Sequence, residues 1–403
     1  MGIKQTFLNF LYHNRTKLAN IYFCLFFSWL PVKRNKIVFS NYMGGGYGCN
    51  SKYIAQEIIK QNLPVEIVWI ARSKFSAKDF PPQIRVVDYN KLNHCLYEHA
   101  TAGIWIDNYS KFNLVNAGLC KKKNQIYINT WHGSLGIKRI DENIKILKTN
   151  KAWKSTAIKD YGLIDIMISN SDFETDVYRN AFWYNGKILK LGHPRNDIFH
   201  MNNKDLKRTI LKNLGISEKS KIVLYAPSFR DNLRIDCFNL DYKGLKECLD
   251  NKSGENWVVL SRFHPKNIFS VQYLNHVSEF QKDVSFYPDI QELLYISDLL
   301  ISDYSSCMFD FMLTKRPCFI YAEDITQYNN ERGFYYKLES TPFPIAENNV
   351  QLIKNIENFD NTKYQSACAE FLHAKGALED GKASMRVIKL IKELLNSKNS
   401  FRG

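Results

Sequence analysis

The sequence lacks the cysteine and carboxylate arrangements that mark disulfide-rich, zinc-binding and metal-dependent proteins. Its nine cysteines are scattered, and no two of them form a Cys-x-x-Cys pair. An odd, dispersed set argues against a disulfide framework or a zinc site and is typical of buried thiols in a reducing cytoplasm. Neither an Asp-x-Asp sequence nor a carboxylate cluster with metal-ligand spacing occurs, so we predict no metal site.

The glycine signatures of common nucleotide and hydrolase sites are also missing. The stretch Asn41–Gly48 is rich in glycine, but its spacing is neither Gly-x-Gly-x-x-Gly nor a Walker loop, and no Gly-x-Ser-x-Gly occurs. A dinucleotide fold, an NTPase and a serine hydrolase of that type therefore have no support. Such a strand-to-helix loop can hold phosphate or an acceptor on its backbone N–H groups, or it can be a flexible turn.

No long hydrophobic run is present near the N-terminus. The apolar stretch Ala19–Leu30 has about a dozen residues, short of the roughly 20 that span a bilayer. Residues 1–36 contain no acidic residue, and basic residues flank the apolar stretch on both sides. We predict a basic, aromatic-rich helix in residues 1–35 that lies on an anionic membrane surface, which makes the protein peripheral on the cytoplasmic face of the membrane. The alternative is a helix packed on the protein core.

Acidic residues are in the minority throughout. The chain has 55 basic and 40 acidic residues, a net charge of +15, which indicates an anionic partner. Because the charge is spread through the chain and no zinc finger or ribonucleoprotein signature occurs, we predict no nucleic-acid partner. A phosphorylated substrate or an acidic membrane face fits the charge instead.

Short runs rich in Val and Ile alternate with helical stretches from Lys36 onward, as in parallel sheets with crossover helices. We therefore predict an α/β protein whose two doubly wound, Rossmann-like domains face a central cleft. The expected strands are 36–40, 65–70, 84–87, 103–106, 126–130, 165–169, 221–226, 257–262, 284–286, 298–302 and 317–321. The expected domains are 36–200 and 201–403, the second ending in a helix at about 383–395.

One predicted strand leads into the residues on which we centre the functional prediction. The strand 126–130 runs directly into His132 and Gly133, and the polar residues Ser134 and Lys138 follow. Open α/β sheets place their chemistry at the carboxyl ends of the strands. We predict that His132 is the catalytic base of a transferase.

Later segments supply positive groups in the same setting, where an apolar strand ends and polar residues appear. Arg230 follows the first strand of the second half and can bind a phosphate bidentately. Arg262 and His264 are two residues apart, so their side chains point the same way in an extended chain. Arg332 lies beside a glycine further on. These groups are suited to an anionic diphosphate.

Two more segments offer hydroxyl and carboxylate groups. Ser305 and Ser306 follow Asp303 and would cap a helix whose N-terminal N–H groups attract phosphate. Arg195 and Asp197 follow a glycine and a proline, where they can pair with each other or hold a ligand, or simply form a turn between domains. Together the segments favour transfer of a group between a nucleotide-bound phosphate and a hydroxyl.

These motifs occur in an order that resembles a known family. In chain order they are Trp131-His-Gly-Ser, Gly192-His-Pro-Arg-Asn-Asp, Tyr225-Ala-Pro-Ser-Phe-Arg-Asp, Arg262-Phe-His-Pro, Asp303-Tyr-Ser-Ser with Phe309-Asp-Phe, Arg316-Pro and Arg332-Gly-Phe-Tyr. The stretch from about Ile37 to Tyr335 is similar to the CDP-glycerol glycerophosphotransferase family, the teichoic-acid primases and polymerases of bacteria.

The resemblance implies a GT-B fold whose C-terminal half holds CDP. It implies transfer of glycerol phosphate from CDP-glycerol to a hydroxyl of a membrane-bound, lipid-linked acceptor, with release of CMP and without a cofactor. His132 would be the base, and His264 would assist at the diphosphate and the leaving CMP. The residues expected around the donor phosphates are Arg230, Arg262, Asp303, Ser305, Ser306 and Arg332. Those expected on the acceptor side are Gly133, Ser134, Lys138, Arg195 and Asp197.

The chain departs from the family pattern around one loop. Ser134 stands where the family usually has Thr, which retains a hydroxyl, and Leu-Gly-Ile follows where many members have Pro-Leu. Two alternative activities stay open at this point: a ribitol-phosphate transferase using CDP-ribitol, and a GT-B glycosyltransferase using a nucleotide sugar. The polymer served can be teichoic acid, a capsule or a lipopolysaccharide side chain.

Overall fold

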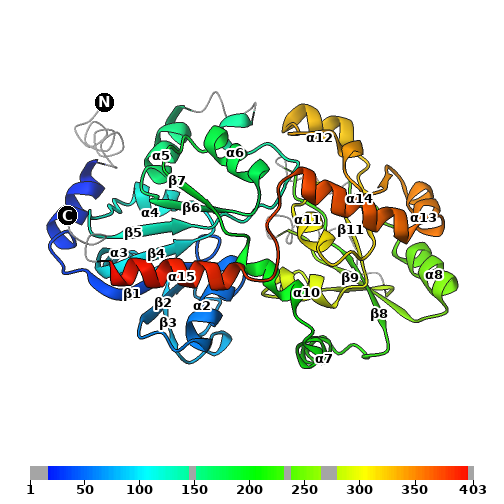
Figure 1. Cartoon of the computed structure of the whole chain (residues 1–403), viewed down its shortest axis with the longest axis horizontal. Helices are drawn as coiled ribbons and strands as arrows, with labels where there is room; N and C mark the ends of the chain where they lie inside the picture. Colours follow the sequence, from blue (N-terminus) through cyan, green and yellow to red (C-terminus); the bar gives the residue numbers. More distant parts are fainter. Residues whose placement is uncertain (1–16, 145–150, 231–236, 265–278, 398–403) are drawn as a thin grey trace, which may run out of the picture.

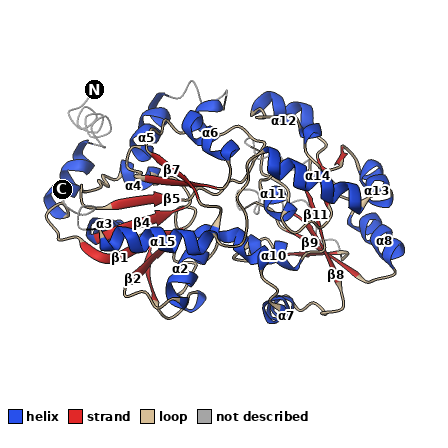
Figure 2. Cartoon of the chain, viewed as in Figure 1, coloured by secondary structure: helices blue, strands red, loops and turns tan. Residues whose placement is uncertain are grey.

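The computed structural model describes residues 17–144, 151–230, 237–264 and 279–397 (Figure 1). They form two parallel β-sheets, each with helices on both faces, as Figure 2 shows in red and blue. This arrangement confirms the predicted α/β architecture of two doubly wound, Rossmann-like domains. Among the described residues, no helix is both long and apolar enough to cross a membrane.

The first sheet has seven strands in the order β3-β2-β1-β4-β5-β6-β7. Its strands are β1 (Lys33–Ser40), β2 (Glu66–Ala71), β3 (Ile84–Asp88), β4 (Ala102–Asp107), β5 (Ile126–Asn129), β6 (Ile166–Ser169) and β7 (Lys187–Lys190). The helices between them are α2 (Cys49–Lys60), α3 (Leu92–Thr101), α4 (Phe112–Asn116), α5 (Lys151–Tyr161) and α6 (Asp172–Ala181). The central strands are buried on both faces, as expected of a parallel sheet covered by helices.

The second sheet has six strands in the order β10-β9-β8-β11-β12-β13. They are β8 (Lys221–Tyr225), β9 (Trp257–Ser261), β10 (Gln281–Asp283), β11 (Leu299–Ser302), β12 (Cys318–Tyr321) and β13 (Ile345–Ala346). The accompanying helices are α7 (Lys204–Asn213), α8 (Tyr242–Ser253), α10 (Ile290–Ile296), α11 (Cys307–Met312), α12 (Ile325–Glu331), α13 (Asn349–Glu357) and α14 (Asn361–Ala374).

The prediction differs from the structure mainly at the sheet edges. The strand expected at 284–286 lies instead at Gln281–Asp283, whose exposed, polar residues pair only with β9. The edge strands β7 and β13 were not predicted, because a four-residue strand flanked by lysines and a two-residue strand carry little apolar signal. Central strands are recognised in the sequence by their apolar residues, which are buried. The formation of an edge strand depends on the neighbouring strand with which it pairs.

The C-terminal helix α15 (Ala383–Asn396) returns to the first half of the molecule. Figure 1 shows it in red beside α2, running across the first sheet. Val387, Ile388 and Ile391 are buried in the same core cluster as the strands β1, β2 and β4. The sequence predicts this helix as part of the second domain, but its packing shows that it covers the first. Chain order alone could not reveal the crossing, because an amphipathic helix can pack on either sheet.

The helical segment 17–26 packs on the first half with one face only. Phe23 and Phe27 are buried in the core cluster beneath this sheet. The opposite face carries large apolar side chains that stay exposed: Leu18, Ile21, Leu25, Phe26 and Trp29. One face of this segment therefore packs on the protein core, and the opposite face is exposed, as contact with a membrane surface requires. The basic residues before position 17 lie outside the described residues.

Candidate active site

Each sheet has a point at which its strand order reverses. In the first sheet it lies between β1 and β4, and in the second between β8 and β11. Ligands of open α/β sheets bind outside the carboxyl ends of the strands at such points, because the loops leave there in opposite directions and open a crevice. The loop after β5, next to the first reversal point, contacts the loops after β8 and β11, because Lys138 Nζ lies 3.5 Å from Ser228 Oγ and the ideal Cβ position at Gly136 lies 3.6 Å from Ser306 Cβ.

His132 lies at the carboxyl end of β5, beside the reversal point of the first sheet. Its Nδ1 is 2.8 Å from the main-chain oxygen of Asn108. A carbonyl oxygen can only accept, so Nδ1 carries the proton and Nε2 keeps its lone pair. The ring is enclosed by those of Trp131, Tyr109 and Tyr42, at centroid distances of 4.2, 5.2 and 5.1 Å. The tautomer is the one that a base acting through Nε2 needs.

The surroundings of His132 hold it neutral. Burial lowers the pKa of His132 to about 3; the hydrogen bond to Asn108 opposes this, and the positive charges of Arg195 and Lys138 add to it. Near neutral pH the imidazole is therefore unprotonated and available as a base. An anionic diphosphate bound next to it would raise its pKa toward the range that suits proton transfer.

Asn108 organises the surroundings of His132. It is fully buried; its side-chain amide donates to Asn41 Oδ1 (2.7 Å), and its Oδ1 accepts from the N–H of Tyr42 (3.0 Å). Asp107 supports it from below by accepting the N–H groups of Asn108 (2.7 Å) and Tyr109 (3.1 Å). Tyr42 has a positive φ of 44°, a strained conformation for a non-glycine residue, and these contacts hold it there. Asn108 thus fixes both the tautomer of His132 and the position of the neighbouring Tyr42 ring.

The glycine-rich loop after β1 does not form an open phosphate cradle. The ideal Cβ position at Gly48 is 3.3 Å from the main-chain oxygen of Pro288 and 3.6 Å from Asp289 Oδ1, both in the second half. Lys52, in the first turn of α2, pairs with Asp289 at 2.8 Å and with Glu292 at 2.5 Å. The start of α2 is therefore packed against acidic groups of the other half, which opposes phosphate binding.

A short antiparallel pairing carries the loop after His132 across to the second half. Lys138 and Phe334 form a β-bridge, with hydrogen bonds from Arg139 N to Gly333 O (3.0 Å) and from Tyr335 N to Ile137 O (2.8 Å). Arg332 Nε donates to the main-chain oxygen of Arg139 (3.3 Å). This pairing brings the expected acceptor loop and the expected donor residue Arg332 into direct contact.

Arg230 and Asp303 lie at the reversal point of the second sheet, but they bind each other. Arg230 Nη1 is 2.9 Å from Asp303 Oδ2, and the guanidinium also holds Asp324 bidentately at 2.6 and 2.9 Å. It donates to the main-chain oxygen of Ser228 as well (2.7 Å) and is 3% exposed. These contacts engage four of the five guanidinium N–H groups, so Arg230 stiffens the loops that line the site, and its expected role at the donor phosphates stays a prediction.

The remaining donor-side candidates are partly exposed. Arg262 leans on the main-chain oxygens of Tyr287 (2.5 Å) and Val284 (3.3 Å). His264 stacks near Phe229, with ring centroids 4.6 Å apart. Arg262 also lies within electrostatic reach of Tyr42, the ring over His132. His132 therefore belongs to the first half, and His264 to the second.

The serines before α11 serve the helix less than expected. Ser305 Oγ accepts weakly from Cys307 N at 3.4 Å, whereas the Ser306 side chain makes no capping hydrogen bond. The ideal Cβ position at Gly136 is 3.6 Å from Ser306 Cβ, so the loop after Ser134 passes directly over these hydroxyls. They therefore lie where the two halves meet.

The acceptor-side candidates Arg195 and Asp197 have structural partners instead. Arg195 is 2% exposed; it pairs with Asp310 (3.0 and 3.2 Å) and donates to the main-chain oxygen of Gly133 (2.8 Å). Asp197 accepts the N–H groups of Ala383 (2.9 Å) and Ser384 (2.7 Å) at the start of α15. Both assignments to the acceptor are corrected: Arg195 locks the His132 loop to the second half, and Asp197 holds the returning helix.

Ser134 is also turned inward. It is 2% exposed, and its Oγ accepts from Asn170 Nδ2 at 2.9 Å. Asn170 donates in turn to Glu379, whose pKa burial raises to about 7. The Ser134 hydroxyl therefore fixes the loop on which His132 stands rather than pointing into the site.

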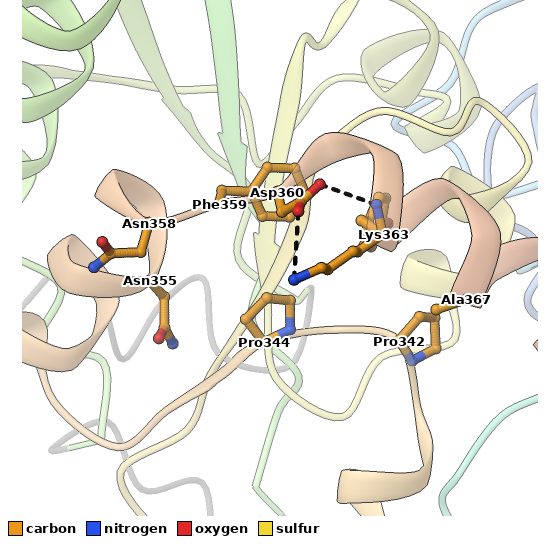
Figure 3. Close-up of a pocket in the computed structure, with 9 residues that line it drawn as sticks. Pro342, Pro344, Asn355, Asn358, Phe359, Asp360, Lys363 and Ala367 are labelled. Carbon is orange, nitrogen blue, oxygen red and sulfur yellow. Dashed lines mark hydrogen bonds and ion pairs between the residues drawn. The ribbon is translucent and has the colours of Figure 1, made fainter.

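The site described above is separate from the hollow shown in Figure 3. That hollow, of about 300 Å³, lies between α13 and α14 at the outer end of the second half and is lined by Pro342, Pro344, Asn355, Phe359 and Lys363 among others. Its charged groups pair with each other, since Lys363 Nζ is 3.7 Å from Asp360 Oδ2. None of the residues predicted to act on substrate lines it.

Comparison with known proteins decides the family. Residues 22–393 match the family model described as CDP-glycerol:poly(glycerophosphate) glycerophosphotransferase. The chain belongs to this glycerophosphotransferase family. The match runs through both sheets and includes every predicted site residue, so it confirms the resemblance read from the motifs.

Relatives of this glycerophosphotransferase family cover most of the chain. The teichoic acid poly(glycerol phosphate) polymerase of Bacillus spizizenii is 31% identical over 401 residues, which is 93% of this chain and 96% of that protein. The teichoic acid glycerol-phosphate transferase of Staphylococcus aureus is 32% identical, covering 90% and 94%. The chain spans about half, 51%, of the longer Staphylococcus epidermidis polymerase, to which it is 32% identical.

Solved structures agree with the family assignment. The wall teichoic acid polymerase TagF superposes with a TM-score of 0.81 at 28% identity, covering 98% of this chain and 99% of the TagF chain. A TagF structure obtained after a soak with CDPG gives 0.80 at 29%. A putative UDP-N-acetylglucosamine 2-epimerase from Listeria monocytogenes, 14% identical with a TM-score of 0.53, shares the fold alone.

Sequence reasoning missed one segment of this glycerophosphotransferase family member. Asp107, Asn108 and Tyr109 follow the predicted strand 103–106 and have the same form as the chosen motifs, an apolar strand that ends in polar residues. The segment contains no Gly, Pro, His or Arg, the residue types on which the predicted site is based. Their position after β4, at the reversal point of the sheet, was the available signal.

Proposed function

We propose that this protein transfers glycerol phosphate from CDP-glycerol to a hydroxyl of a membrane-bound glycan or polyol-phosphate acceptor, with release of CMP. The observation that carries the proposal is the Nδ1–H tautomer of His132, fixed by Asn108 at the edge where the two halves meet. The family assignment supports the donor class. CDP-glycerol acts here as a substrate, and we propose no cofactor.

The reaction requires one proton transfer and one phosphoryl displacement. The acceptor oxygen attacks the phosphorus that bears glycerol while its proton passes to Nε2 of His132. The bond between that phosphorus and the bridging oxygen breaks, and CMP leaves with the oxygen. Positive groups on the second half, Arg262 and Arg332 among them, neutralise the diphosphate as charge moves to CMP, and His264 assists there.

Relatives named for glycerol phosphate support glycerol over ribitol. The two reported above match at 31% and 32% over nearly their whole length. A teichoic acid ribitol-phosphate primase of Bacillus spizizenii matches at 30%, and a poly(ribitol-phosphate) polymerase at 26%. We therefore propose teichoic acid or a related cell-surface polymer as the product.

A donor panel tests the proposal. The purified protein is incubated with a lipid-linked acceptor and with CDP-glycerol, CDP-ribitol or a UDP-sugar, and nucleotide release and product mass are measured. We expect CMP and a mass gain of glycerol phosphate with CDP-glycerol only. Release of UDP alone would establish the glycosyltransferase alternative, and turnover of CDP-ribitol alone would move the protein to the ribitol branch.

We also propose that the exposed face of the N-terminal helix rests on the anionic cytoplasmic face of the membrane. The face is apolar, with Leu25 66% and Trp29 71% exposed, and the cations Lys17 and Lys33 lie near its ends. Apolar side chains in the interface and lysines at the headgroups both favour binding to anionic lipid. The protein would thereby meet its lipid-linked acceptor at the surface.

Liposome flotation tests this docking. The double change Leu25→Ser and Trp29→Ser should release the protein from vesicles containing anionic lipid while leaving its fold intact. Val350→Ser, at an equally exposed apolar residue on α13, serves as the matched control and should leave binding unchanged. Retained binding by the double variant would assign the membrane contact to another surface.

A further inference from the structure

Lys138 is carried from the first half into the nucleotide side of the second half. The β-bridge between Lys138 and Phe334 fixes its backbone, and its Nζ reaches Ser228 Oγ at 3.5 Å. Ser228 follows β8, and its N–H donates to Asp303, which follows β11 (2.8 Å). The ammonium group therefore stands over the reversal point of the second sheet, where open α/β folds bind nucleotide phosphates.

The charges around Lys138 suit an anion rather than a neutral acceptor. In the described part of the chain Lys138 has no ion pair, and its one hydrogen bond is the long contact to Ser228. Arg332 and Arg230 are further cations within electrostatic reach. Asp303 is the facing carboxylate, but Arg230 and the N–H of Ser228 already engage it. A partly buried ammonium among cations, without a committed carboxylate, is a site prepared for negative charge.

The neighbouring Arg230 is already paired with carboxylates. The guanidinium of Arg230 is paired with Asp303 and Asp324, so Lys138 adds a cation to Arg262 and Arg332 on the donor side. Lys138 stands within a few residues of His132 in the chain, and its charge also acts on that imidazole. Lys138 thus lies near both His132 and the loop after β8, where we expect the nucleotide phosphates.

We propose that Lys138 binds the donor diphosphate directly, so that the donor site is completed by the first half of the chain. This assignment rests on the proposed function, and it replaces the acceptor-side role expected for Lys138. Because Lys138 and His132 lie in one loop, binding of the donor to Lys138 would also hold in place the loop that carries His132. The first half thereby contributes to both substrates.

Direct binding of CDP-glycerol without acceptor tests the proposal by titration calorimetry. Lys138→Gln should raise the Kd of CDP-glycerol roughly 10- to 100-fold, the usual worth of a charge-assisted hydrogen bond. Lys138→Arg keeps the charge and should bind within about threefold of the wild type. Lys154→Gln is the matched control: Lys154 pairs with Glu142 at 2.9 Å in the same half, and removing its charge should leave the Kd unchanged.

The pH dependence of binding gives a second readout. Burial lowers the pKa of Lys138 to about 8, and the charge of Arg332 contributes. The diphosphate favours the protonated ammonium, so affinity should change little between about pH 7 and pH 8 and fall by up to tenfold per pH unit above pH 8. Arg332 and Arg230 stay charged in this range, and the pKa of the Cys307 thiol is raised to about 11. Lys138→Arg should therefore abolish the fall.

The outcomes separate this proposal from the transferase function. If Lys138→Gln binds CDP-glycerol as tightly as the wild type and instead raises the KM of the acceptor, Lys138 belongs to the acceptor and the proposal is wrong, while the transferase function stands. A variant that loses donor affinity but keeps the wild-type thermal midpoint supports direct binding. If the wild type itself neither binds nor turns over CDP-glycerol, the proposed function fails first.

Discussion

Replacing His132 by Asn gives the sharpest test of the mechanism. The amide of Asn can still donate to the main-chain oxygen of Asn108, as Nδ1 of His132 does at 2.8 Å. It offers no basic nitrogen in place of Nε2. We therefore expect turnover to fall by about 10²–10⁴, the usual contribution of a general base, with little change in the KM of CDP-glycerol.

The structure also predicts how this change alters stability with pH. In the native state the pKa of His132 is about 3, whereas an unfolded histidine titrates near ~6.5. Between those values the unfolded chain takes up a proton that the native chain refuses, so stability falls as the pH falls below ~6.5. At pH 5 this linkage amounts to about 2 kcal/mol, from 1.36 kcal/mol for each unit below the unfolded pKa. The His132→Asn variant has no imidazole at this position, so it should not show this loss of stability at pH 5.

Two measurements check the prediction. CMP release with acceptor gives kcat, and urea unfolding at pH 7 and pH 5 gives the change in stability for wild type and variant. Other buried histidines, such as His99, titrate equally in both proteins, so the difference isolates residue 132. A variant within about tenfold of wild-type turnover would remove His132 from the chemistry. An equal loss of stability in both proteins would contradict the neutral imidazole at position 132.

Three further substitutions probe the supports of the site. Asn108→Ala should release Tyr42 from its strained turn and lower kcat at least tenfold, with a smaller effect on donor Kd; unchanged kinetics would contradict the positioning role of Asn108. Asp310→Asn leaves the buried Arg195 without its charge partner and should cost about 3–5 kcal/mol in denaturant unfolding, since an uncompensated charge stays buried. Asp197→Ala should loosen α15 by about 1–2 kcal/mol, seen as faster amide exchange in that helix, while CDP-glycerol affinity stays as in the wild type.

The sequence determined the architecture and the central histidine. Buried parallel strands need continuous apolar runs, so most strands could be located from composition, and edge strands such as β7 and β13 could not. His132 was found because a polar residue directly after such a run must lie at the carboxyl edge of the sheet. Both inferences use only local pattern and the geometry of parallel sheets.

The tertiary structure alone decided which charged residues are free to meet a substrate. Three charged residues expected to bind an anion or the acceptor have partners far away in the chain. Arg195 pairs with Asp310, Arg230 pairs with Asp303 and Asp324, and Asp197 binds the start of α15. A guanidinium or carboxylate in a motif has the same appearance whether it faces solvent or a buried counter-charge. The pairing depends on contacts between the halves, and these are set by packing that local sequence does not specify.

The same limit explains Lys138 and Asn108. The family resemblance implies an acceptor-side role for Lys138, but beyond the bridge to Phe334 its Nζ reaches Ser228 Oγ in the second half. Asn108 carries no mark of function in the sequence, and it matters because its main-chain oxygen meets His132 and its amide meets the loop after β1. Sequence determines which groups are present at a strand end. The fold determines which of them retain an unused charge or lone pair, because a buried polar group must be satisfied by whatever packing brings to it.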